Sequence, residues 1–247
     1  MLREWKKEGG TVTLVDDWNI LYRDARIISL FGIVVSSNRV LSPQSIPCIT
    51  ENIIAELMLL IQESHDPIKI VINNIGGGVN DGFAINQAME HVKVKGIEIW
   101  TINICQAASM AAMILMMGTK GRRYVLNNTI THLHSGTTNP GEARPEDLDS
   151  FMKFAEKHFR ATFHKWLLEN TKLPEYWNRT SGAEYSEDQL AKPAIRLKLV
   201  QDFLHGERYL VASEAVEAGI ADKVLMPGDP IIDEIYKVLS IGGRTNV

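Results

Sequence analysis

The stretch that decides the fold is GIEIWTINICQAASMAAMILMMG, residues 96–118. It begins with an apolar, β-branched run typical of a buried strand and ends with an apolar run of good helix formers. Between the two runs a hydroxyl, Ser109, lies next to two alanines and a methionine. The pattern predicts a tight turn from strand to helix over QAASM, residues 106–110, with Ser109 where the helix begins.

A serine at this position has two interpretations. Backbone N–H groups in the first turn of a helix lack partners within the helix, and the helix dipole favours negative charge there. Ser109 could therefore act as a nucleophile, with the N–H of Met110 directed at a developing oxyanion. Its hydroxyl could equally cap the helix. The G-x-S-x-G pattern of α/β-hydrolases does not apply to this segment.

Strand and helix patterns alternate before this stretch. The apolar run RIISLFGIVV, residues 26–35, precedes a segment with helical spacing at 49–64, and PIKIVINN, residues 67–74, precedes another at 81–95. Such crossover units build parallel sheets, and nearly continuous apolar strands predict a sheet covered on both faces. The sequence therefore predicts an α/β fold.

The pattern continues towards the C-terminus. A strand pair is predicted in RYVLNNTITHLHSG, residues 123–136, and a long helix from about 145 to 170 carries one mostly apolar stripe. Little of the predicted core remains for this stripe to cover, which favours a protruding interface helix. A further helix is predicted around 194–204, and SEAVEAGIADKVL, residues 213–225, predicts a short helix and a final strand.

Composition excludes several classes of protein. The 30 acidic and 26 basic residues nearly cancel, which argues against a nucleic-acid surface or a polybasic membrane anchor. No apolar run approaches the roughly 18 residues of a membrane span, and the N-terminus is charged where a signal peptide would be apolar, so a cytoplasmic protein is expected. The two cysteines, Cys48 and Cys105, are predicted to be reduced core residues.

Three consecutive glycines, residues 76–78, follow the strand at 67–74. A phosphate-binding loop would continue with Lys and Ser or Thr, whereas this chain continues Val-Asn-Asp-Gly, so a nucleotide site is disfavoured. Loops at the carboxyl ends of neighbouring parallel strands converge, which makes the N–H of Gly77 a candidate oxyanion donor beside Ser109.

A nucleophilic hydroxyl needs a base. His132 and His134 are two residues apart in one predicted strand, so their rings face the same side. Two such rings could bind a metal, but a third ligand is not evident nearby and no metal or cofactor is predicted. His134, the nearer to the following loop, is the candidate base. The carboxylate that would orient it is predicted to be Glu207, with Asp202 as the alternative, although either could be a solvated charge.

Together these segments resemble the proteolytic subunit of the Clp protease, in the ClpP/crotonase superfamily. Residues 71–89 resemble the family's glycine-turn segment, and 105–126 are similar to its nucleophile segment over their full length. Residues 131–136 correspond to the histidine segment, and 213–225 match the closing element. The resemblance extends from about Ile27 to Leu225.

The resemblance implies a ClpP/crotonase-like fold of repeated β-β-α units and a serine peptidase. Ser109 would be the nucleophile, His134 the base and Glu207 the acid, with Gly77 and Met110 donating to the oxyanion. The implied activity is an endopeptidase of a self-compartmentalised protease, which degrades unfolded polypeptides delivered by a separate ATP-dependent AAA+ unfoldase.

The resemblance also implies an organisation for the chain. Residues 1–24 would form an arm at an axial pore, 25–226 the peptidase domain, and 227–247 a C-terminal extension. The helix at about 145–170 would interlock two stacked seven-membered rings of this chain. Residues at about 178–206 are longer than the family's connection and are predicted to be an insertion.

Several departures from the family pattern leave alternatives open. Glu207 stands where the family has an aspartate, Ile75 where it has a proline and Cys105 where it has a glycine, and the proline after the histidine is missing. A non-catalytic ring subunit or scaffold of the same fold is one alternative, favoured by the altered acidic position and the longer connection before it. An acyl-CoA enzyme of the crotonase branch is another, because it shares the glycine-turn oxyanion chemistry without needing a serine–histidine pair.

Overall fold

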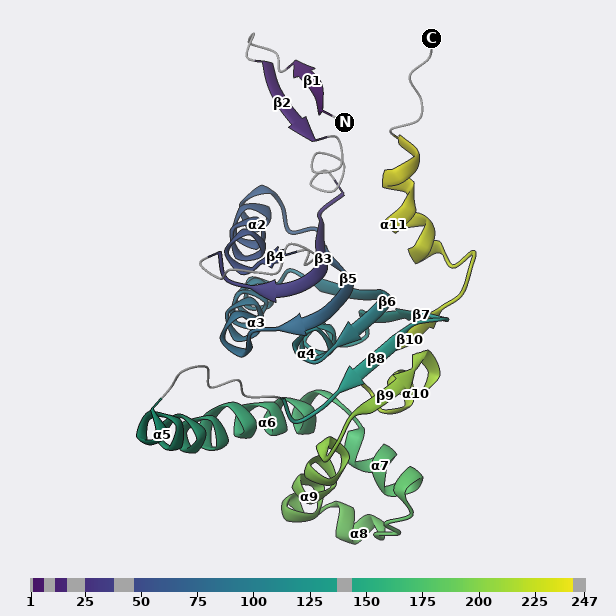
Figure 1. Cartoon of the computed structure of the whole chain (residues 1–247). Coiled ribbons are helices and arrows are strands. Elements are labelled where there is room, and N and C mark those ends of the chain that lie inside the picture. Colours follow the sequence, from purple (N-terminus) through teal and green to yellow (C-terminus); the bar gives the residue numbers. More distant parts are fainter. Residues whose placement is uncertain (1, 7–11, 17–24, 38–46, 137–143, 242–247) are drawn as a thin grey trace.

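The computed structural model describes residues 2–6, 12–16, 25–37, 47–136 and 144–241 (Figure 1). Its centre is an eight-stranded sheet in the order β10-β7-β6-β5-β3-β4, with β8 paired to β6 and β9 paired to β8. The strands are β3 (Ile27–Val35), β4 (Pro47–Ile49), β5 (Ile68–Gly77), β6 (Ile99–Ala108), β7 (Arg123–Leu126), β8 (Ile130–Leu133), β9 (Arg208–Val211) and β10 (Lys223–Leu225). The β8–β9 pair is antiparallel and the other pairs of this sheet are parallel. The predicted α/β fold is confirmed.

Helices follow the strands in the predicted alternation. Those beside the sheet are α2 (Thr50–Glu63), α3 (Val79–Val94), α4 (Met110–Met116), α10 (Ala212–Glu217) and α11 (Pro230–Ile241). Those after β8 are α5 (Pro145–Ala155), the π-helix η1 (Glu156–Arg160), α6 (Ala161–Asn170), α7 (Leu173–Ser181), α8 (Glu187–Leu190) and α9 (Pro193–Leu204).

Alternation along the strands divides the core into two clusters. Leu30, Ile70 and Ile72 point to the face covered by α2, α3 and α4, and all three are fully buried. Val71 points to the other face, where it joins a smaller cluster that includes Ile235 of α11. Both faces of the sheet therefore carry apolar cover, as the continuous apolar strands predict.

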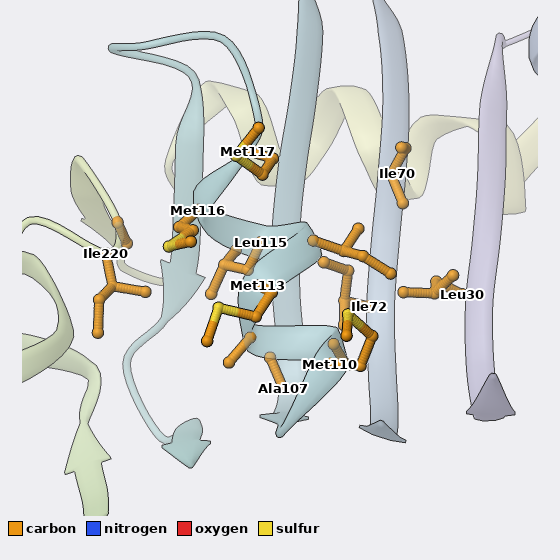
Figure 2. Close-up of a cluster of buried hydrophobic side chains, with 14 of the residues drawn as sticks. Leu30, Ile70, Ile72, Ala107, Met110, Met113, Leu115, Met116, Met117 and Ile220 are labelled. Carbon is orange, nitrogen blue, oxygen red and sulfur yellow. The ribbon is translucent and has the colours of Figure 1, made fainter. Parts of the chain in front are cut away.

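Helix α4 lies at the centre of the larger cluster. All seven of its residues are buried, as expected for a helix that is apolar on every side. Figure 2 shows Met110 close to Ile72, and Ile220 on the opposite side of the helix. Each fully buried methionine or leucine contributes about 1.5–3 kcal/mol of transfer free energy, so α4 is firmly held against β5 and β6.

The long helix predicted over 145–170 is confirmed as three consecutive helical segments, α5, η1 and α6. Its C-terminal part packs on the core, where Phe83 makes edge-to-face contacts with Phe159, Phe163 and Trp166. Its N-terminal part extends away from the sheet (Figure 1). Large apolar side chains of α5 are exposed there, with Phe151 at 44% and Phe154 at 48%.

The segment predicted as an insertion forms the end of α7, then α8 and α9, and the helix predicted around 194–204 is confirmed as α9. Helix α9 packs on α6 and α7. The rings of Trp177 and Phe203 make an edge-to-face contact, and Arg208 stacks over Trp177 at 4.7 Å. This segment is therefore folded against its neighbouring elements and is not a loose loop.

The final strand is joined to the sheet by a buried ion pair. Arg123 on β7 donates to both carboxylate oxygens of Asp222, at 2.9 and 2.5 Å. Burial alone would raise the pKa of Asp222, but its hydrogen bonds with Arg123 and its attraction to that charge outweigh burial and lower the pKa. Asp222 is therefore ionised in the folded protein and fixes β10 beside β7.

The two ends of the chain lie outside the central sheet. Strands β1 (Leu2–Lys6) and β2 (Val12–Asp16) form an antiparallel pair, and the remainder of the predicted arm at 1–24 lies outside the described residues. Of the predicted extension at 227–247, the described part contains α11, and residues 242–247 lie outside the description. Across the described ranges, no helix has the length and apolarity that crossing a bilayer requires.

The prediction for the two cysteines is half right. Cys48 is buried, whereas Cys105 is exposed, and both are free thiols. Strand β6 pairs with β7 up to Asn103 and with β8 from Gln106 onward, so Cys105 lies where the sheet changes partner. The apolar sequence around Cys105 could not reveal that this residue lies at the change of strand partner and is exposed.

Candidate active site

Ser109 is the single residue between β6 and α4. The turn predicted over five residues is therefore tighter than expected, and it gives Ser109 a φ of 54° and a ψ of −121°. A non-glycine residue at positive φ costs about 1–3 kcal/mol and persists only where its surroundings fix it. Its N–H donates to the carbonyl of His132 at 2.8 Å, which fixes the turn to β8.

The hydroxyl of Ser109 does not cap α4. The backbone carbonyl of Ser109 accepts from the N–H groups of Ala112 and Met113, at 3.1 and 3.3 Å, but its side chain makes no capping hydrogen bond. The capping interpretation of this serine is therefore wrong. The N–H of Met110 belongs to the first turn of α4, where helix geometry provides no partner.

The hydroxyl instead meets an imidazole. Nε2 of His134 lies 2.7 Å from Oγ of Ser109. Strand β8 runs parallel to the end of β6, with Thr131 opposite Ala107 and His132 opposite Ala108, so His134 leaves β8 beside the turn. The sheet register thus brings together two residues that are 25 positions apart.

His134 is poised to accept a proton. Burial lowers the pKa of its imidazole; the carboxylate of Glu207 opposes this effect, and the neighbouring His132 adds to it. The net effect is a pKa below the ordinary value of about 6.5. The neutral ring can accept a hydrogen bond from Ser109 at Nε2 when its proton is on Nδ1, the nitrogen that faces Glu207.

Glu207 lies beside the histidine, as the sequence predicts, but its hydrogen bond goes elsewhere. Leu133 is opposite Arg208 in the β8–β9 pair, which places Glu207 next to His134. Oε1 of Glu207 is 3.7 Å from Nδ1 of His134, beyond hydrogen-bond length, while Oε2 makes a short hydrogen bond with Nε2 of His132. The side chain of Glu207 is 56% exposed.

Asp202, the alternative carboxylate, forms an ion pair on the surface. Asp202 pairs with Lys198, one turn earlier on α9, and about half of each side chain is exposed. This ion pair is exposed to solvent. Glu207, in contrast, lies within ion-pair distance of the imidazoles of His132 and His134. Asp202 is therefore not brought into the candidate site.

The glycine turn at the end of β5 contacts Ser109 directly. A methyl group added to Gly76 would lie 2.7 Å from both the carbonyl oxygen of Ala108 and Cβ of Ser109, and Gly76 has a φ of +93°. Gly77, the predicted oxyanion donor, is the next residue, and a methyl group added there would lie 2.0 Å from the carbonyl oxygen of Val34. The close approach at Gly76 was missed from sequence, although the glycine run was its signal.

His132 is the second residue that sequence analysis left without a role. Its ring stacks between those of Tyr209 and His134, with centroids 4.3 and 5.1 Å away. The spacing of two residues predicted correctly that both histidines share a side of the strand. Their shared carboxylate could not be foreseen, because it depends on the register of β9.

Two cavities lie where the long helix meets the inserted segment. One, of about 310 Å³, is lined by Ser135, Glu156, Arg160, His164, Gln201, Leu204 and His205. The other, of about 460 Å³, continues between α6 and α9 as far as Leu168 and Leu197. Helix α9 thus supplies one wall of both cavities, and Ser135, the residue after His134, lines the smaller one. In the part of the chain that is described, no three His, Cys, Asp or Glu side chains are grouped so that they could hold a metal.

A parallel sheet that presents a serine hydroxyl to a neutral imidazole at its carboxyl edge has the arrangement used by serine hydrolases. The chain belongs to the Clp protease family, since the family model described as Clp protease matches residues 23–175, more than half of its length. Its domain is accordingly that of a ClpP-like peptidase. The match includes Ser109 and His134 and ends before Glu207.

Proposed function

We propose that the protein is a serine endopeptidase in which Ser109 is the nucleophile and His134 the general base. The observation that carries the proposal is the 2.7 Å contact between Oγ of Ser109 and Nε2 of His134. Oγ attacks the peptide carbonyl while His134 takes its proton, and His134 then gives this proton to the leaving amine. Water hydrolyses the resulting acyl-enzyme by the same proton transfers in reverse.

The other groups of the site stabilise the charges that form during the reaction. Glu207 faces Nδ1 of His134, so its carboxylate stabilises the imidazolium that forms during each transfer. We assign the oxyanion to the N–H groups of Gly77 and Met110. Two features support this assignment: helix geometry provides no partner within α4 for the N–H of Met110, and the glycine turn packs closely on Ser109.

We further propose that the substrates are unfolded polypeptides and that the chain assembles with itself into stacked rings, seven-membered by resemblance to the family. The exposed apolar side chains of α5 support an interface at the end of the long helix. In this assembly residues 1–24 are an arm at the axial pore, 25–226 the peptidase domain and 227–247 an extension. A separate ATP-dependent AAA+ unfoldase would deliver the substrates.

Substitution of the nucleophile tests the proposed function. Ser109→Ala should abolish cleavage of an unfolded polypeptide and of short fluorogenic peptides, and should also abolish labelling by a fluorophosphonate. Ser186→Ala is the matched control, because Ser186 caps the short exposed helix α8 in the inserted segment. Undiminished cleavage by Ser109→Ala would refute the proposal.

A non-catalytic ring subunit is the second candidate, and one observation favours it. The hydrogen bond of Glu207 goes to His132, and its other oxygen stays 3.7 Å from His134. If this geometry persisted in the assembled protein, the imidazolium would lack a close counter-charge. A stable ring that never takes up a fluorophosphonate would support this candidate.

A further inference from the structure

We infer that His132 is a positioning residue, which holds the carboxylate of Glu207 against His134 so that two histidines share one acid. The inference rests on the proposed function, because it concerns the efficiency of the same site. Its basis is that each carboxylate oxygen of Glu207 lies beside a different histidine. Oε2 is hydrogen-bonded to Nε2 of His132, and Oε1 faces Nδ1 of His134 at 3.7 Å.

Glu207 needs such a partner. Its side chain is 56% exposed and carries one methylene more than an aspartate, so water and rotamer freedom compete with a productive position. A carboxylate on a long, exposed side chain contributes little unless its geometry is fixed. The hydrogen bond from His132 removes that freedom at one oxygen and leaves the other to face His134.

The ring of His132 is itself fixed by the strand pair. His132 and Tyr209 are directly opposite each other in the antiparallel β8–β9 pair, and their rings stack at 4.3 Å with an interplanar angle of 12°. On its other side the ring stacks with His134 at 5.1 Å and 18°. The side chain of His132 is only 14% exposed, so it offers a more rigid anchor than Glu207 itself.

The arrangement also fits the proton transfers. As a donor through Nε2–H, His132 satisfies Oε2 and leaves Oε1 to face His134. When His134 takes the proton of Ser109, its new positive charge attracts Oε1, and a contact that is long in the resting site shortens to a charge-assisted hydrogen bond. His132 would thus keep the acid within reach of that step.

A double-mutant cycle tests the inference. His132→Phe keeps a ring to stack with Tyr209 and His134 but has no N–H donor. In the wild-type background we expect kcat to fall about tenfold with KM unchanged, as for coupled residues in one network. In the Glu207→Ala background the same substitution should cause no further loss. Equal losses in both backgrounds, or no loss in either, would overturn the inference.

Further variants separate positioning from folding. His132→Gln retains a donor and should recover part of the loss; a glutamine no better than phenylalanine contradicts the proposed hydrogen bond. His132→Leu, which also lacks a donor, carries the cycle if His132→Phe does not assemble. His65→Phe makes the same change at an exposed histidine and should leave kcat unchanged.

The pH profile adds a readout that a structural role would not move. Glu207 raises the pKa of His134 and His132 lowers it, so His132→Phe is compared with His132→Gln, because both variants remove the imidazole of His132. Loosening of Glu207 should place the acid limb of kcat/KM at lower pH in His132→Phe than in His132→Gln; identical limbs contradict the inference. Failure of the underlying function is distinguishable. If the wild type shows no Ser109-dependent cleavage, the proposed function itself fails, whereas additive losses in an active enzyme overturn only the role of His132.

Discussion

Ser109 and Glu207 approach the same imidazole from opposite sides, but the backbone places the first and side chains place the second. Ser109 is fixed by its φ of 54°, by its N–H bond to His132 and by Gly76 packed against it. Glu207 is 56% exposed and depends on one hydrogen bond from a histidine side chain. The position of Ser109 therefore follows from the backbone of the fold, whereas the position of the Glu207 carboxylate depends on a contact between side chains.

The largest loss of activity is expected from substitution of His134, the imidazole that lies between Ser109 and Glu207. His134→Ala removes the proposed general base, and general acid–base catalysis contributes about 10²–10⁴-fold, so we expect kcat to fall by about that factor. The measurement is single-turnover cleavage of a fluorogenic peptide. The double variant with Ser109→Ala should be no slower than either single variant, because the two residues act as a unit. If the loss of kcat in the double variant were instead the product of the two single losses, Ser109 and His134 would act independently, which would contradict the proposed pair.

The second largest loss of activity is expected from a substitution in the glycine turn that packs against Ser109. Gly76→Ala would place a methyl group 2.7 Å from Cβ of Ser109, so we expect the turn to shift and activity to fall about 100-fold. Gly121→Ala is the matched control, since Gly121 has a similar φ of +85° with nothing within 4 Å of an added Cβ.

The control should lose only about 1 kcal/mol of stability through backbone strain, and its activity should be unchanged. Cleavage rates and thermal melts of both variants make the comparison. Equal activity in the two variants would show that contact with Gly76 does not shape the turn at Ser109.

On the acid side, Glu207→Gln should act mainly on the pH profile. Protonation of His134 inactivates it, and burial lowers its pKa, so wild-type activity should persist below pH 6.5 and fall only through the lowered pKa. The charge of Glu207 raises that pKa, so its removal should move the acid limb to still lower pH. We expect kcat to fall about tenfold, less than for a buried triad acid, because Glu207 is half-exposed. An acid limb that moves to higher pH would contradict this assignment.

The smallest effect is expected outside the site. Asp202→Asn removes a carboxylate only five residues before Glu207, but its partner is Lys198 on the exposed side of α9. Surface ion pairs of this kind contribute little, so neither cleavage nor the melting temperature should change measurably. A loss of activity comparable to that of Glu207→Gln would return Asp202 to the list of candidate acids.

The same division explains what could be predicted from sequence. The strand–turn–helix order around Ser109 and the shared side of His132 and His134 follow from apolar periodicity, because periodicity reports backbone geometry. The long helix after the histidines was predictable for the same reason. These features required no knowledge of side-chain conformations.

The rest depends on contacts between segments that are distant in sequence. The exposure of Cys105 arises where β6 changes partner from β7 to β8, and the hydrogen bond of Glu207 to His132 depends on the β8–β9 register. The tight packing of Gly76 on Ser109 depends on how β5 and β6 end together. Such pairings have no local pattern in the sequence.

The most direct test of the account is to locate the residue that an active-site reagent modifies. After treatment with a fluorophosphonate, intact mass and peptide mapping should show one adduct per chain, on Ser109, formed more slowly as His134 is protonated and lost in His134→Ala. An adduct on another residue, or labelling of Ser109 at the same rate without His134, would contradict a serine activated by its neighbouring imidazole.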